Sequence, residues 1–327
     1  MNSLAHQLYE TALQMVEAEQ ATPSEKAEML MEIAMGLQQK PKSPDQLTNA
    51  VALYEKALAL APETDPLLRA RIKARMGTAL QAQPSADAAP LHRAQAAFEA
   101  ALSVLEEQGS PEEQAEIWMN LGLVIQSLAA INQAKITDAI NAYQRALQVF
   151  DAGRHPAEYA ILHNNLATAF LSIPMTDARA KMREALAVQS FEAALKVINI
   201  VDHPAEYAML QNNLGNALQY ASSAHTLENN LRALQAYDEA LRVRNARDTP
   251  LEYANTIANK ANALRNLPDN MEHPELGNRG NLRQAAKLYL EAREIFLRFG
   301  DREKLEHIES ALTDLEHAQG DWEKSSN

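Results

Sequence analysis

A spacing of small and aromatic residues recurs along the chain and restricts it to one kind of fold. Each occurrence has an alanine, an aromatic residue four positions later and a second alanine three positions after that. The six internal trios are Ala50-Tyr54-Ala57, Ala94-Phe98-Ala101, Ala139-Tyr143-Ala146, Ala187-Phe191-Ala194, Ala233-Tyr237-Ala240 and Ala285-Tyr289-Ala292. Ala5-Tyr9-Ala12 adds a seventh near the N-terminus. Because these spacings place three side chains on one helix face, the sequence predicts seven similar helices, here termed B-type.

A second element alternates with the trios. HPAEYAILHNNLATAF from His155 recurs as HPAEYAMLQNNLGNAL from His203, and fainter copies lie on both sides. The six copies share a proline, at Pro23, Pro66, Pro111, Pro156, Pro204 and Pro250. Proline is favoured in the first helical turn, where its missing N–H costs nothing. We therefore expect a second set of helices, termed A-type, each beginning at its proline.

The A-type segments share a column of small residues. Its members are Ala34, Gly77, Gly122, Ala167, Gly215 and Ala261. A small residue in mid-helix allows a neighbouring helix to approach closely. One A-type and one B-type helix cannot bury both of their apolar faces, so that neighbouring pairs must stack into an α-solenoid.

Composition agrees with an all-α chain, because alanine and leucine dominate its apolar residues and only 5% of its residues are aromatic. We expect about fourteen helices in one solenoid over residues 1–319. It would comprise a B-type half-repeat at 2–19, six A/B units at about 22–299 and a capping helix with a polar outer face at about 301–318. Residues 320–327 are predicted to be a disordered tail.

The chain resembles the tetratricopeptide repeat family over nearly its whole length. The third unit carries the signature best, with Trp118-x-x-Leu121-Gly122 followed by Ala139, Tyr143 and Ala146. Pro62 stands where the closing proline of such a repeat would fall. The units exceed the usual 34-residue period by about ten residues, and this longer form is similar to the repeats of kinesin light chain and of long-repeat cyanobacterial proteins. The resemblance implies a right-handed superhelix.

The same resemblance implies a concave groove lined by A-type helices, in which a peptide or helical segment would bind. The candidate groove residues are Asn164, Thr168, Asn212, Asn216, Gln219, Tyr220, Asn255, Asn262 and Arg265. A ladder of asparagine amides, each with one acceptor and two donors, could hold an extended main chain.

Several alternatives stay open for this surface. The neighbouring asparagine column (Asn120, Asn165, Asn213 and Asn259) would either bind a ligand or bond to adjacent helices and fix their angle. In the first unit, Met31 and Met35 fit an adaptable apolar surface or core filling equally well. The long loop at 267–281 is either a second binding surface or tolerated loop growth.

The sequence disfavours other classes of function. The net charge of −13 opposes a nucleic-acid or anionic-membrane partner, and no apolar stretch is long enough to insert into a bilayer. No P-loop, zincin, nucleophile-elbow or dinucleotide motif is present, and the chain has no cysteine. His155 and His203 lack the further ligands that a metal site needs, so we expect neither metal nor cofactor.

A chaperone-tail clamp is disfavoured too, because Met209 and Asn212 stand where such a clamp would need basic residues. The sequence-based hypothesis is a cytoplasmic, non-catalytic scaffold that binds a protein or peptide. Two alternatives are an assembly factor for a multi-subunit complex, such as a photosynthetic one, and a sensor that responds to a peptide.

Overall fold

The computed structural model describes residues 4–39, 41, 43–85, 87–173, 179–221 and 225–325. In these ranges the chain forms fourteen α-helices and a short 3₁₀ helix, with no strand, which confirms the predicted all-α fold. None of the described helices has both the length and the apolar character needed to cross a lipid bilayer.

The two predicted helix types alternate. The A-type helices are α2 (Pro23–Gln39), α4 (Pro66–Gln81), α6 (Pro111–Ala130), α8 (Pro156–Ser172), α10 (Pro204–Gln219), α12 (Pro250–Arg265) and α14 (Arg302–Ser325). The B-type helices are α1 (Leu4–Ala18), α3 (Pro44–Leu60), α5 (Ala89–Gln108), α7 (Ile136–Ala146), α9 (Ala180–Leu195), α11 (Thr226–Leu241) and α13 (Arg279–Phe299). The 3₁₀ helix η1 (Pro274–Leu276) lies in the loop before α13. Every A-type helix except the last begins at its predicted proline.

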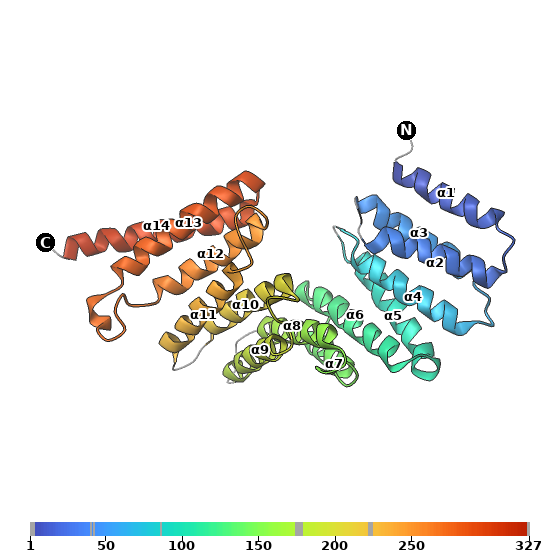
Figure 1. Cartoon of the computed structure of the whole chain (residues 1–327), viewed down its shortest axis with the longest axis horizontal. Helices are drawn as coiled ribbons and strands as arrows, with labels where there is room; N and C mark the ends of the chain where they lie inside the picture. The colour runs from blue at the N-terminus through green and yellow to red at the C-terminus, as the bar shows by residue number, and fades with distance from the viewer. Residues whose placement is uncertain are drawn as a thin grey trace. The chain divides into compact units, whose positions relative to one another are not determined.

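The helices form two compact units, which divide the predicted solenoid between α7 and α8. Unit 1 spans Met1–His155 with α1–α7, and unit 2 spans Pro156–Asn327 with α8–α14. Within each unit, an A-type helix packs on the B-type helix that follows it, and that helix packs on the next A-type helix (Figure 1). Each unit is thus a stack of helical hairpins, the arrangement of an α-solenoid.

Side-chain caps start several A-type helices where the sequence places a polar residue before the proline. The Asp65 carboxylate accepts a hydrogen bond of 3.0 Å from the backbone N–H of Leu68. Ser110 and Glu113 form a reciprocal capping box, with bonds of 2.9 and 3.2 Å. These bonds satisfy N–H groups that a helix start leaves unpaired.

The small and aromatic columns form the core, as predicted. All six internal alanine–aromatic–alanine trios are buried, with no residue more than 1% exposed. A Cβ atom built on Gly77 would lie 2.8 Å from the ring of Phe98, and one on Gly215 would lie 2.5 Å from the ring of Tyr237. The glycines therefore receive the aromatic ring of their own hairpin partner.

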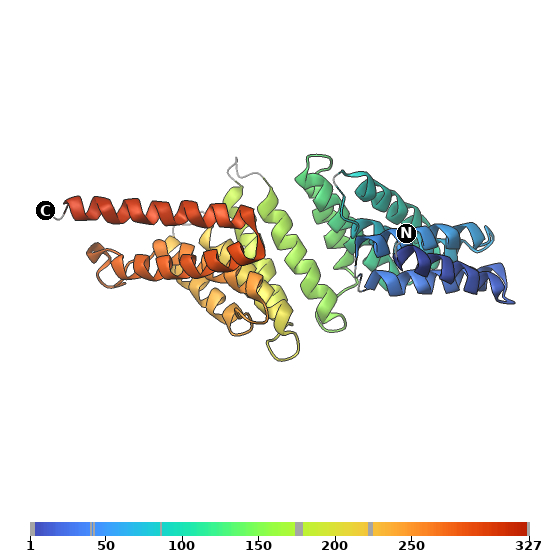
Figure 2. The same ribbon diagram turned by 90° about the horizontal axis from the view of Figure 1, so that it is seen from above.

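The last helix ends the stack. The other A-type helices carry their small residue eleven positions after the first residue of the helix. At this position α14 has Thr313, which is exposed, as are its helix neighbours Glu309 and Glu316. One face of α14 packs on α13 through Ile308 and Leu315 (Figure 2), and the opposite face is polar, as a cap requires. The helix reaches Ser325, past the expected end at 318 and into the predicted tail.

Candidate functional site

Five of the nine predicted binding residues occupy two register positions of the A-type helices: Thr168, Asn216, Gln219, Asn262 and Arg265. The residues one and four positions after the small residue of each A-type helix are here called the A-helix face of their unit. One position after it lie Met35, Thr78, Leu123, Thr168, Asn216 and Asn262. Four positions after it lie Gln38, Gln81, Gln126, Leu171, Gln219 and Arg265.

Buried tyrosines reach this face from beneath. Four tyrosine hydroxyls donate to an amide oxygen of the preceding A-type helix: Tyr54 to Gln38 at 2.9 Å, Tyr143 to Gln126 at 2.7 Å, Tyr237 to Asn216 at 2.7 Å, and Tyr289 to Asn262. Burial raises the pKa of each of these tyrosines, so the hydroxyls stay protonated and remain donors. Two candidate ligand-binding amides, Asn216 and Asn262, therefore have a structural partner.

The two hairpins that have phenylalanine instead of tyrosine carry threonine one position after the small residue, where the last two tyrosine hairpins carry Asn216 and Asn262. The Thr78 hydroxyl donates to the backbone carbonyl of Ala74 at 3.3 Å, and the Thr168 hydroxyl donates to that of Asn165 at 2.9 Å. Threonine thus satisfies its hydroxyl on its own helix, where no buried phenol needs an acceptor.

Asparagine amides also connect three A-type helices of unit 2. Asn164 Nδ2 donates to Asn165 Oδ1 at 3.3 Å, and Asn213 Nδ2 donates to Asn164 Oδ1 at 3.1 Å. Asn212 Nδ2 donates to Asn213 Oδ1 at 3.3 Å, and Asn259 Nδ2 donates to Asn212 Oδ1 at 3.2 Å. The chain of amides runs from α8 through α10 to α12. Two members of the column, Asn213 and Asn259, thus bond to an adjacent helix, as the second interpretation has it, whereas Asn165 bonds to Asn164 of its own helix. Asn212 is only 8% exposed and offers little surface to a ligand.

Four of the nine candidates line an open hollow of about 400 Å³ in unit 2. Gln219 and Tyr220 come from the end of α10, and Asn262 and Arg265 from the end of α12. The rest of the wall is formed by Asn266, Asn278, Leu282 and Leu315. The structure therefore brings together the C-terminal candidates, while Asn164, Thr168, Asn212, Asn216 and Asn255 lie outside this hollow.

The hollow offers groups suited to a peptide. Tyr220 is 63% exposed. The Arg265 guanidinium hydrogen-bonds to the Tyr289 hydroxyl and has a loose ion pair, 3.7 Å, with the exposed carboxylate of Asp314. Since Asn262 Oδ1 is occupied by Tyr289, its Nδ2 group is the donor that it can offer. An amide donor, a guanidinium and an exposed phenol can bind main-chain carbonyls, a carboxylate and an apolar side chain respectively.

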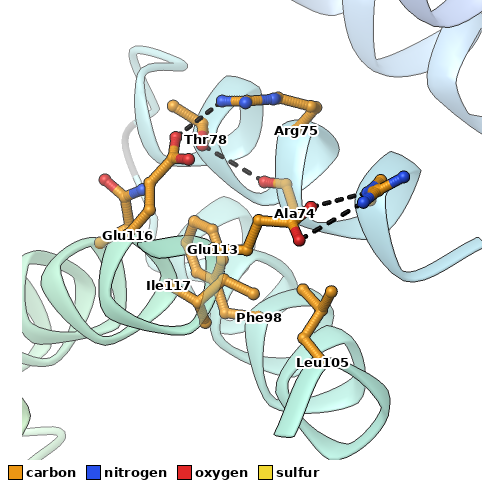
Figure 3. A pocket seen from close by; sticks show the side chains of 10 residues that line it. Ala74, Arg75, Thr78, Phe98, Leu105, Glu113, Glu116 and Ile117 are labelled. Atoms are coloured by element: carbon orange, nitrogen blue, oxygen red, sulfur yellow. Dashed lines mark hydrogen bonds and ion pairs between the residues drawn. The ribbon is translucent and has the colours of Figure 1, made fainter. Parts of the chain in front are cut away.

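In unit 1, the junction between α4 and α6 is closed by ion pairs from residues that precede the small residue of α4, outside the two A-helix-face positions. Arg71 Nε lies 2.6 Å from one carboxylate oxygen of Glu113, and Arg75 lies 2.7 Å from that of Glu116 (Figure 3). Only about 40 Å³ of space remains beneath these pairs, over the ring of Phe98. Both guanidinium groups thus have a close carboxylate partner, whereas the ion pair of Arg265 with Asp314 is 3.7 Å long.

The ion pair between Arg71 and Glu113 should make the free energy of unfolding depend on pH in the acid range. The hydrogen bond from Arg71 lowers the pKa of Glu113, so that the pair stabilises the fold fully above the unfolded-state pKa of about 4.3 and loses this contribution as pH falls through the lower folded-state pKa. In urea titrations across this range, Glu113→Gln should reduce the acid dependence while keeping the Ser110 cap. Arg71→Gln should produce the same change, and the double variant should add nothing; additive losses would contradict the pairing.

Among the described residues, no group of three histidine, aspartate or glutamate side chains is placed to hold a metal ion. His155, one of the two histidines considered above, packs edge-on against the ring of Phe150 at 5.1 Å. A comparison of the chain with protein-family models and with curated proteins finds no match.

Part of the site escaped sequence reasoning. Asn266, Asn278, Leu282 and Leu315 come from a loop, the start of α13 and the capping helix, and share no repeat register. The tyrosine–amide pairing left only a partial signal. Each tyrosine hairpin has asparagine or glutamine at one of the two A-helix-face positions, but the Phe98 hairpin also has one, Gln81.

Proposed function

We propose that the protein is a non-catalytic scaffold of the tetratricopeptide type that binds a peptide or helical segment of another protein on its A-helix face. The observation that carries this proposal is the hollow at the ends of α10 and α12, with the exposed Tyr220 beside the Arg265 guanidinium, whose ion pair with Asp314 is loose. A right-handed superhelix, as in that family, would present this face on its inner side.

The contrast between the two units supports unit 2 as the anchor. The arginines between α4 and α6 are held by ion pairs of 2.6 and 2.7 Å, whereas Arg265 lies 3.7 Å from Asp314, a carboxylate that is 63% exposed. A ligand carboxylate can replace Asp314 at little cost, because exposed pairs contribute only about 0–1 kcal/mol. We infer that the bound segment carries an acidic residue, or a C-terminal carboxylate, beside an apolar side chain.

The test uses the double variant Tyr220→Ala with Arg265→Ala. It should lose the partner in pull-downs from the native host, because it removes the apolar contact and the guanidinium. Helical circular dichroism and the melting temperature should change little, since both side chains line an open hollow.

The matched control is Arg247→Ala, which removes an exposed arginine from the loop before α12. It should retain the partner. Undiminished binding by the double variant would refute the assignment of the hollow. Asn164, Asn212 and Asn216 are unsuitable for this test, because their amides bond to one another's helices and to Tyr237.

A further inference from the structure

The B-type helices of neighbouring hairpins are joined by a recurring ion pair. The residue after the core aromatic of one helix faces the residue before the first alanine of the next. Glu55, after Tyr54, lies 2.7 Å from Arg93. Glu192, after Phe191, lies 2.5 Å from Arg232. At two junctions, α3–α5 and α9–α11, one register site thus carries a carboxylate and the facing site an arginine.

The junction between α5 and α7 differs from these two. In the same register, Glu99 follows Phe98, and Asp138 stands before Ala139, where α5 and α11 have arginine. Two carboxylates therefore occupy the positions of an ion pair.

The two carboxylates line a groove of about 510 Å³ within unit 1. Its floor is apolar and consists of Leu102, Trp118, Leu121, Ile125 and Ala142, while Glu99, Glu106 and Asp138 lie on its rim. The Arg145 guanidinium covers the Trp118 ring at 4.4 Å from its centre, so the cation on the groove wall is already engaged. The groove thus has an apolar floor beside two carboxylates, Glu99 and Asp138, and no arginine stands at the position that Arg93 and Arg232 occupy in α5 and α11.

We infer that this groove binds a basic segment of a partner protein, whose arginine takes the place that Arg93 and Arg232 fill at the α3–α5 and α9–α11 junctions. Its guanidinium would lie between Glu99 and Asp138, and a neighbouring apolar side chain would contact the floor. Arginine suits the site because its planar fork can reach two carboxylates at once. A second copy of the chain is a poor occupant, since its net charge of −13 repels an acidic rim.

This surface is separate from the proposed peptide site, which lies on the A-helix face of unit 2. Loss of one can therefore be distinguished from loss of the other. The Tyr220 and Arg265 variant should bind the probe described next as well as the unaltered protein does.

The experiment uses full-length protein with Trp322→Phe, so that Trp118 is the one remaining tryptophan of the two in the chain. The probe is an acetylated and amidated octapeptide of alternating leucine and arginine, titrated while Trp118 fluorescence is followed. The control peptide has citrulline, a neutral analogue, in place of arginine. We expect saturable binding of the arginine peptide and at least tenfold weaker binding of the citrulline peptide, about the effect of losing one well-formed charge pair.

The decisive variant is Asp138→Arg, which creates inside the chain the ion pair of the α3–α5 and α9–α11 junctions. It should weaken probe binding by roughly tenfold or more while the melting temperature stays the same or rises. Glu107→Arg makes the same change in charge at an exposed position of α5 outside the groove, and should alter affinity by less than about twofold. The nearly isosteric Glu99→Gln is a second variant and should weaken binding in the same direction.

Equal losses in Asp138→Arg and Glu107→Arg would overturn the inference, because long-range charge would then explain binding. Equal affinity for the citrulline peptide, no binding of the arginine peptide, or unchanged binding by Asp138→Arg would overturn it as well. Self-association of the unaltered protein that Asp138→Arg abolishes would identify a second copy as the occupant, against the assignment made here.

Discussion

Replacement of Tyr237 by alanine is expected to lower the free energy of unfolding by about 3–5 kcal/mol, the usual cost of deleting a buried aromatic ring. Tyr237 is fully buried, and it lies between the two alanines of its helix, Ala233 and Ala240, which are also fully buried. Its ring faces Gly215, which has no side chain to move into the space left behind. Urea denaturation followed by circular dichroism measures the loss. Hydrogen exchange should locate it in α10 and α11 first, because a solenoid hairpin depends mainly on its neighbours.

Tyr237→Phe is the matched control. It keeps the ring and removes only the hydrogen bonds of the hydroxyl, 2.7 Å to Asn216 and 2.9 Å to the Gln219 amide. The expected loss is about 0.5–1.5 kcal/mol. If the phenylalanine variant were as unstable as the alanine variant, the hydrogen bonds rather than the ring would hold the hairpin together.

The helices and their pairing could be read from the sequence because both are encoded locally. Each of the six prolines, Pro156 for example, marks the first residue of a helix, since its ring permits that position and few others. The four-and-three spacing of Ala233, Tyr237 and Ala240 fixes which face of α11 is buried. The end of α14 was harder to predict, because a polar capping helix has no second apolar face whose end would mark its last residue.

The roles of the asparagines could not be read in the same way. Whether Asn164 binds a ligand or another helix depends on its distance from Asn213, which is set by the packing of α8 and α10 rather than by local sequence. Asn164 is the first and Asn213 the second asparagine of the NN pair of its repeat, and periodicity alone does not show that the two meet across neighbouring helices. The amide chain became apparent only when the helices were placed.

The wall of the hollow posed a different difficulty, since half of its residues lie outside the repeat register. Asn278 reaches the backbone carbonyl of Arg265 at 2.8 Å from the end of the long loop before α13. The same loop is held by Asp269, whose carboxylate accepts hydrogen bonds of 2.7 Å from the backbone N–H groups of Gly280 and Asn281. A long irregular connection can thus be ordered by a few side chains that no composition rule singles out.

The small-residue column predicts opposite effects for the same substitution at two glycines. In an exposed helix interior, glycine to alanine stabilises by up to about 1 kcal/mol, and Gly36→Ala should do so, because nothing lies within 4 Å of its Cβ position. Gly215→Ala should destabilise by about 1–3 kcal/mol despite the same gain in helix propensity, since the new Cβ would lie 2.5 Å from the Tyr237 ring. The ring cannot swing aside without breaking the bonds of its hydroxyl to Asn216 and Gln219. The measurement is the urea midpoint of unfolding of each single variant, which should rise for Gly36→Ala and fall for Gly215→Ala relative to the unaltered protein. A stabilising Gly215→Ala would mean that the aromatic ring does not rest on the glycine, and the close approach of helices on which the whole stack depends would need another cause.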